Sequence, residues 1–287
     1  MRYLGTHIST SGGISQAPLR AKEIPVNTIQ FFAKNNNQWL AKSLPSAAEV
    51  EAYFANRASC GIQIAFSHAG YLINLASPDP KNHDLSIQSL TQEMELARLL
   101  KLDFVVLHPG AHVGEGVVAG VARIAENLDR LLENFSDIET KLLLETTAGQ
   151  GTSIGHTFEQ LAQILDKIGA EKKLGICLDT AHVFAAGYDI RTKAGYEKMW
   201  LEFDGTLGFD RLQAIHLNDS KTALGSRVDR HEHIGLGQIG DAGFKMLMQD
   251  KRFEKIPMAL ETPKGDDFVK WDRMNLERLK SYLFRQP

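Results

Sequence analysis

The stretch LGICLDT, residues 174–180, shows the pattern that decides the fold: a short apolar run that ends at an acidic residue. Similar runs begin near residues 3, 28, 62, 104, 141, 212 and 256, and none of them alternates apolar with polar positions. Strands that are buried on both faces have this composition, as in a parallel sheet. The sequence therefore predicts eight buried strands.

Helical periodicity separates these runs. Apolar residues repeat at intervals of three and four over residues 87–100, 124–135 and 158–168. Strands that alternate with helices predict parallel β/α units, and eight such units close a TIM barrel. An open doubly wound sheet is the alternative, but no G-x-G-x-x-G motif follows the first strand. We predict an α/β protein with a single (β/α)8 TIM barrel.

Composition sets limits on the class of protein. The chain has 287 residues, is 43% hydrophobic and shows no linker, so we expect one TIM-barrel domain over residues 1–287. Its two cysteines, Cys60 and Cys177, form no C-x-x-C pair. The N-terminus lacks a signal-peptide pattern, and no apolar stretch is long enough for a membrane span. We expect a cytoplasmic protein without membrane contact.

Residues that bind metals stand at the ends of six successive predicted strands. They are His68, His108, Glu145, Asp179, His216 and Glu261, and two loops add His182, Asp229 and His231. In a TIM barrel the carboxyl ends of the strands meet at one rim. Four carboxylates at one rim repel one another unless cations compensate them. Metal ions are the simplest compensation.

The ligand types narrow the choice of metal. Imidazole and carboxylate without thiolate suit Zn²⁺, with Mn²⁺ or Fe²⁺ as chemical substitutes. Nine ligand groups exceed what one or two tetrahedral ions need, and three ions fit if one carboxylate bridges. In the D-R-H triplet, Asp229 and His231 face the same way on extended backbone, whereas Arg230 points elsewhere, where it is placed to meet a phosphate.

Longer motifs carry a family resemblance over essentially the whole chain. They are GTHISTSGG at 5–13, KNNNQW at 34–39, HAGYLINL at 68–75, HPGAH at 108–112, ETTAGQG at 145–151, GICLDTAHVFAAGYD at 175–189, HLNDSKTALGSRVDRHEHIGLGQIG at 216–240 and LET at 260–262. With these motifs the chain resembles the endonuclease IV family, the metal-dependent apurinic/apyrimidinic endonucleases of base-excision repair.

The resemblance implies a trinuclear zinc cluster. His68 and His108 would hold one ion, and Glu145 would bridge it to a second, which Asp179, His216 and Glu261 complete. The remaining three ligands, His182, Asp229 and His231, would bind the third ion. In the same reading Glu145 fixes the distance between two metals and Glu261 helps to orient the attacking hydroxide. These two residues are therefore the expected catalytic carboxylates.

The implied reaction is hydrolysis of the phosphodiester on the 5′ side of an abasic site. It leaves a 3′-hydroxyl and a 5′-deoxyribose phosphate, and family behaviour implies repair of blocked 3′ ends as well. The partner is damaged double-stranded DNA, and the family suggests a monomer. Three Zn²⁺ would change the formal net charge from −3 to about +3.

Five loop residues are expected to contact DNA: Lys34, Asn37, Tyr71, Leu72 and Arg230. Tyr71 and Leu72 are the expected wedges in the base stack. Family members often carry an arginine where this chain has Asn37, which leaves the filling of the stack from that loop in question.

Two other functions compete with this interpretation. A metal-dependent sugar isomerase or epimerase on a similar barrel shares strand-end His, Asp and Glu ligands, but it normally uses one or two ions and does not need the D-R-H site. A catalytically silent DNA-binding protein would keep the metals for folding only. The complete ligand set argues against this second alternative.

Overall fold

A computed structural model describes residues 2–169 and 173–283. Eight parallel strands form a closed barrel in the order β1-β12-β9-β8-β6-β4-β3-β2. These strands are β1 (Leu4–His7), β2 (Thr28–Phe31), β3 (Ile64–His68), β4 (Phe104–Leu107), β6 (Lys141–Glu145), β8 (Leu174–Asp179), β9 (Leu212–His216) and β12 (Met258–Leu260). The barrel closes, which confirms the predicted TIM barrel and excludes the open sheet.

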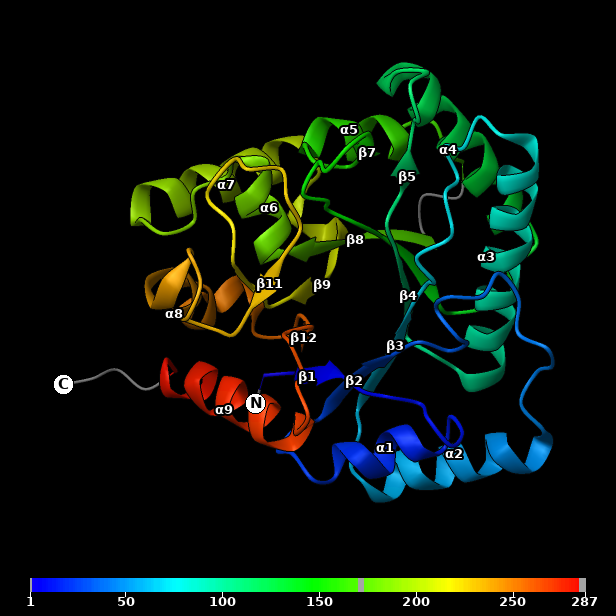
Figure 1. Ribbon diagram of the computed structural model, residues 1–287, viewed down its shortest axis with the longest axis horizontal. Coiled ribbons are helices and arrows are strands. Elements are labelled where there is room, and N and C mark those ends of the chain that lie inside the picture. The colour runs from blue at the N-terminus through cyan, green and yellow to red at the C-terminus, as the bar shows by residue number, and fades with distance from the viewer. Residues whose placement is uncertain (1, 170–172, 284–287) are drawn as a thin grey trace.

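Helices surround the barrel (Figure 1). They are α1 (Gln16–Ala21), α2 (Ala47–Ser59), α3 (Pro80–Leu100), α4 (Val117–Glu133), α5 (Phe158–Leu165), α6 (Thr180–Ala186), α7 (Lys193–Thr206), α8 (Gly240–Gln249) and α9 (Phe268–Ser281), with short 3-10 turns η2 (Phe209–Arg211) and η3 (Lys251–Phe253). The apolar repeat over 87–100 lies on α3, and those over 124–135 and 158–168 begin on α4 and α5 and run two and three residues past the ends of these helices. In α4, for example, Ile124, Leu128 and Leu131 are buried, as expected for an amphipathic helix that covers a barrel.

Two small antiparallel ladders lie outside the barrel. One pairs β5 (Gly110–Ala111) with β7 (Ser153–Ile154), and the other pairs β10 (Asp219–Ser220) with β11 (His231–Glu232). Both join loops that follow the carboxyl ends of barrel strands. They therefore fix the loops from which the predicted ligands project.

A separate apolar cluster fills the barrel. Its buried members are Phe66, Val106, Leu143, Cys177, Ala214 and Ala259. Phe66 stacks on the ring of His216 with centroids 6.5 Å apart, so this apolar cluster contacts one of the residues predicted to bind metal. Burial raises the pKa of the Cys177 thiol well above its usual value, and the residue acts as a core side chain. In the described ranges, each helix is too short or too polar to span a bilayer.

Candidate metal centre

Three groups of ligand atoms gather at the carboxyl ends of the barrel strands. Within each group the atoms lie no more than 4.8 Å apart. The groups are His68–His108–Glu145, Glu145–Asp179–His216–Glu261 and Asp179–His182–His231. Two carboxylates, those of Glu145 and Asp179, each belong to two groups. The three groups are therefore one connected cluster.

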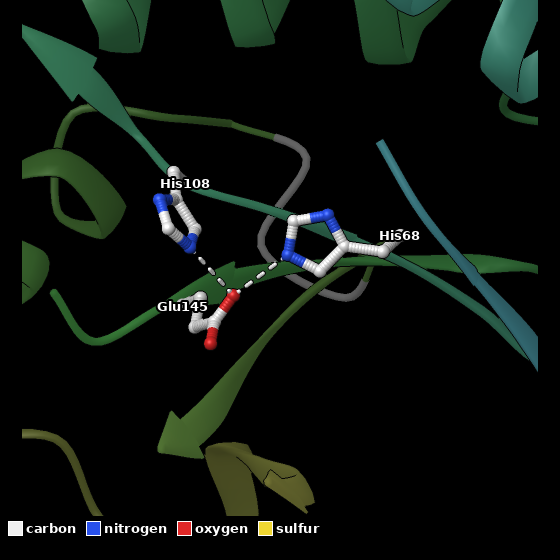
Figure 2. A group of neighbouring side chains, drawn as sticks. All are labelled: His68, His108 and Glu145. Atoms are coloured by element: carbon white, nitrogen blue, oxygen red, sulfur yellow. Dashed lines mark hydrogen bonds and ion pairs between the residues drawn. The ribbon is translucent and has the colours of Figure 1, made fainter. Parts of the chain in front are cut away.

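The first group is organised around one carboxylate oxygen. His68 Nε2 lies 3.0 Å and His108 Nε2 lies 3.1 Å from Glu145 Oε2. Figure 2 shows both imidazoles directed at this oxygen. Glu145 itself is completely buried, whereas the side chain of His108 is 37% exposed. The group therefore opens to solvent on the His108 side.

The second oxygen of Glu145 faces the next group. His216 Nδ1 lies 2.8 Å from Glu145 Oε1 and 3.3 Å from Glu261 Oε2. Glu145 is therefore positioned as a bridge, with one oxygen for each group. Among these carboxylates Glu261 is 17% exposed at its side chain, while Glu145 is fully covered.

Asp229 lies beside His182 and His231 of the third group, although the group itself contains Asp179 where the resemblance implied Asp229. The two oxygens of Asp229 lie 3.1 Å from His182 Nε2 and 3.2 Å from His231 Nε2. The two Nε2 atoms lie 3.4 Å from each other. Two imidazole nitrogens and a carboxylate that face one point form the donor set of a zinc site. The D-R-H triplet thus supplies two side chains to one place, as its spacing predicts.

The sequence DTAH builds part of this geometry locally. Asp179 ends β8 and caps α6, because its Oδ1 accepts a hydrogen bond of 2.8 Å from the backbone N–H of His182. The other oxygen, Oδ2, accepts a hydrogen bond of 2.6 Å from Asn218 Nδ2. The cap places His182 on the first helical turn, beside the strand end that carries Asp179.

Asp219 holds the loop that presents His231. One of its oxygens accepts hydrogen bonds from the backbone N–H groups of Ser220 (2.7 Å) and Ile239 (2.9 Å), and the other from those of Gly235 and Gly237 (3.0 Å each). A Cβ on Gly237 would lie 2.5 Å from Asp219 Oδ1, so only glycine fits there. The glycine-rich end of the long motif is thereby explained.

The second ring nitrogens test whether these histidines suit a metal. His68 Nδ1 donates to the carbonyl of Ala69 and His182 Nδ1 to that of Thr146, each at 2.8 Å. His216 Nε2 donates to Gln30 Oε1 at 2.6 Å. Metal-binding imidazoles are typically oriented by such an outer hydrogen bond, which leaves the other nitrogen free for the ion. The residues therefore fit a metal centre.

Electrostatics at the rim point the same way. Burial acts to raise the pKa of Glu145, but neighbouring His216 and His108 hold it well below its usual value. Burial also opposes the charged form of His68, yet Glu145 raises the pKa of this imidazole to about 9. The pKa of His231 is likewise raised to about 9 against burial, chiefly by Asp179. Protonated imidazoles thus balance the carboxylates, and a divalent cation can replace those protons.

Four of the five residues expected to contact DNA are exposed. The side chains of Asn37 and Arg230 lie at the surface. Tyr71 is 65% and Leu72 is 38% exposed. Tyr71 packs edge-on against Phe32, with ring centroids 5.3 Å apart. Large apolar side chains held outward in this way are available for contact with a partner.

The fifth, Lys34, requires a correction. Its Nζ lies 3.1 Å from Glu93 Oε1, and both side chains are only 1% exposed. Glu93 also accepts a hydrogen bond from the N–H of Gly70 at 3.3 Å. Lys34 is therefore not free to bind a phosphate. It joins its own loop to α3 and to the loop that carries Tyr71.

Two polar residues at the rim are absent from the sequence-based set. Gln30 contacts Glu261 and His216, and Asn218 contacts Asp179 and accepts a hydrogen bond from the N–H of Glu261. Gln30 interrupts an apolar strand, and Asn218 follows a strand-end histidine by two positions. Each of these positions is unusual enough to indicate a role at the rim. Neither was predicted, because the sequence-based ligand pattern consists only of His, Asp and Glu side chains.

The chain is similar to known proteins over nearly its whole length. A profile of the xylose isomerase-like TIM barrel family matches residues 18–282. The probable endonuclease 4 of Geobacter sulfurreducens is 45% identical over 99% of this chain and 95% of its own length. That of Chloroflexus aggregans is 46% identical over 99% and 98%. The chain belongs to the endonuclease IV family.

Solved structures agree with endonuclease IV membership. The crystal structure of endonuclease IV from Thermus thermophilus has a TM-score of 0.86 and 35% identity, and the match covers 99% of both chains. A D-tagatose 3-epimerase-like protein has a TM-score of 0.74 at 20% identity, a likeness that shows the fold alone. The chain is therefore an enzyme of the endonuclease IV family. The only support for the sugar-epimerase alternative is that such proteins share the barrel fold.

Proposed function

We propose that the protein is a zinc-dependent apurinic/apyrimidinic endonuclease of base-excision repair. It hydrolyses the phosphodiester 5′ to an abasic site in double-stranded DNA and leaves a 3′-hydroxyl and a 5′-deoxyribose phosphate. It also removes blocked 3′ ends. In this proposal the enzyme acts as a monomer in the cytoplasm, with three Zn²⁺ per chain and Mn²⁺ as a substitute.

The shared carboxylate of Glu145 is the observation that carries the proposal. It joins two groups of ligand atoms, and the third group connects through Asp179. A cluster of three adjacent sites suits hydrolysis of a phosphodiester, because the oxygen of the attacking hydroxide and the leaving oxygen of the substrate both carry negative charge. An epimerase that binds one or two ions does not need a third metal site, to which Asp229 and His231 are assigned.

Zinc ions at these sites would supply positive charge that stabilises the phosphate oxygens. They would also lower the pKa of a bound water molecule to near neutral, so that hydroxide is available. The residues of the chain determine where that chemistry happens. Glu145, fully buried, keeps the first and second groups at a fixed separation. Glu261 belongs to the second group and is partly open to solvent, so its carboxylate is placed to accept a hydrogen bond from the attacking water and orient it.

Recognition of the lesion falls to the loops around the rim. Tyr71 and Leu72 are exposed apolar side chains next to the His68 group and fit the role of wedges that hold an unstacked nucleotide out of the duplex. Arg230 is exposed and stands in sequence between Asp229 and His231, where it supplies a guanidinium for a backbone phosphate. Asn37 is exposed on the loop after β2, where it adds a neutral polar contact.

A nicking assay tests this function. A duplex with one tetrahydrofuran abasic analogue should be cut once, 5′ to the lesion, by protein that contains close to three zinc per chain. A strong zinc chelator should stop the reaction, and an identical duplex without the lesion should stay intact. The epimerase hypothesis would be supported instead if the protein contained one or two ions, left the lesion uncut and interconverted ketose epimers.

A further inference from the structure

Gln30 is a buried amide in the middle of the proposed metal centre. It lies on β2, is completely inaccessible to solvent, and is paired in register with His7 on β1 and Phe66 on β3. Its side chain reaches two ligands from strands that do not neighbour β2, namely β9 and the residue after β12. An uncharged amide inside a barrel needs a reason, because burying polar groups is costly unless they are hydrogen-bonded.

Both hydrogens of this amide and its oxygen take part in hydrogen bonds. Nε2 donates to Glu261 Oε1 at 2.5 Å and to His7 Nδ1 at 3.0 Å. Oε1 accepts from His216 Nε2 at 2.6 Å. The amide has one orientation only, since a carboxylate accepts but cannot donate, and the opposite orientation would set two oxygens against each other.

This orientation decides which nitrogen of His216 faces the other ligands. Because Oε1 requires a hydrogen on His216 Nε2, Nδ1 is left toward Glu145 and Glu261, at 2.8 and 3.3 Å. The same amide holds one oxygen of Glu261 and leaves Oε2 for the cluster. Glutamine makes both contacts without adding a fifth negative charge to the rim.

We propose that Gln30 is a positioning residue for the group Glu145–Asp179–His216–Glu261, where it sets the tautomer of His216 and the orientation of Glu261. The assignment rests on the metal centre proposed above and extends it to a residue that is not a ligand. Outer-shell partners of metal ligands typically change metal affinity about 10- to 100-fold. Gln30 should therefore affect chiefly the zinc site of this group, whose ligands His216 and Glu261 it contacts.

Two variants separate the two contacts. Gln30→Met has similar length but neither donates nor accepts, so both contacts are lost. Gln30→Glu still accepts from His216 but repels Glu261. The matched control is Ser67→Ala, because Ser67 is also fully buried in the barrel wall and its hydroxyl has no hydrogen-bond partner among the described residues.

Stepwise removal of zinc by a competing chelator is the first measurement. Wild-type and Ser67→Ala protein should release three zinc along the same curve. In Gln30→Met, one of the three should be released at a chelator concentration about 10- to 100-fold lower. Gln30→Glu, which keeps the size of the side chain, should also lose one ion early, and it answers the question if Gln30→Met does not fold.

Histidine-selective ¹⁵N NMR of the zinc-loaded proteins is the second measurement. The Nε2–H signal of His216 should exchange slowly with water in the wild type and in Gln30→Glu, where this hydrogen has an acceptor. In Gln30→Met the hydrogen stays but its acceptor is gone, so the signal should shift and exchange faster. Three zinc in the wild type with unchanged release curves and spectra in both variants would overturn the role of Gln30 alone. A wild type that binds no zinc would remove the metal centre and this role together.

Discussion

Both ends of the barrel contain carboxylates, but these carboxylates pair with different cations at the two ends. At the carboxyl end, the ion pairs found for the four rim carboxylates among the described residues are with histidines. At the amino end, Arg57 lies 3.0 Å from Asp103 and Arg98 lies 2.7 Å from Asp137. Arg98, Asp103 and Asp137 line a hollow of about 650 Å³ together with Lys101 and other residues.

The difference lies in how the negative charge is compensated. A guanidinium stays charged at any physiological pH, so the amino end is balanced permanently and needs no ligand. An imidazole carries a proton only under suitable conditions and also binds metals as a neutral ligand. A rim balanced by histidines can therefore exchange protons for divalent cations. The type of cation that pairs with the carboxylates is therefore better evidence for a functional site than the size of a hollow.

Glu145→Ala should have the largest effect and tests the carboxyl end directly. The variant loses the carboxylate that joins two groups. Since metal charge stabilises a transition state by several kcal/mol, nicking of the abasic duplex should fall by about 10³-fold or more. Single-turnover rates at saturating protein give the measurement. Activity within about tenfold of the wild type would contradict the bridging role.

Zinc removal should make stability depend on pH in a way set by the histidines. The pKa values of His68 and His231 are raised to about 9 in the folded chain, above the usual value near 6.5. Their contribution is therefore fully present below about pH 6.5 and is lost as the pH rises through about 9.

Urea unfolding of chelator-treated protein at about pH 6 and about pH 9 measures this dependence. The metal-free protein should lose several kcal/mol over that interval, because each of the two histidines loses most of the contribution that comes from a pKa raised from about 6.5 to about 9. Zinc-loaded protein should lose less because the imidazoles already bind as neutral ligands. Equal losses with and without zinc would mean that protons and metal do not compete at the rim.

Asn37→Arg sharpens the contrast between the rim and its loops. A guanidinium at this exposed position adds one contact to DNA phosphate, so the salt dependence of log K should steepen by about 0.9. Anisotropy titrations in the Glu145→Ala background give affinity without cleavage. The single-turnover nicking rate of Asn37→Arg alone should stay within about twofold, since position 37 lies outside the metal groups. An unchanged affinity and salt slope would remove this loop from the DNA interface.

Much of the fold and of the site could be predicted from strand ends alone. Glu145, Asp179 and His216 each terminate a barrel strand, and barrel topology brings such positions to one rim regardless of their distance in sequence. Lys34 shows the limit of that reasoning. Its partner Glu93 lies on α3, the helix of the next β/α unit. This pair forms only when the helix packs against the barrel, so no local sequence pattern predicts it.

Arg98→Ala should have the smallest effect, and it tests the amino end of the barrel. The side chains of Arg98 and Asp137 are 44% and 68% exposed, and exposed ion pairs contribute about 0–1 kcal/mol. The free energy of unfolding in urea should therefore fall by less than about 1 kcal/mol, and nicking should match the wild type. A loss of about 3 kcal/mol or more is the size expected for a broken buried pair. It would mean that Asp137 depends on its partner as strongly as a buried rim carboxylate does, and the contrast between the two ends would fail.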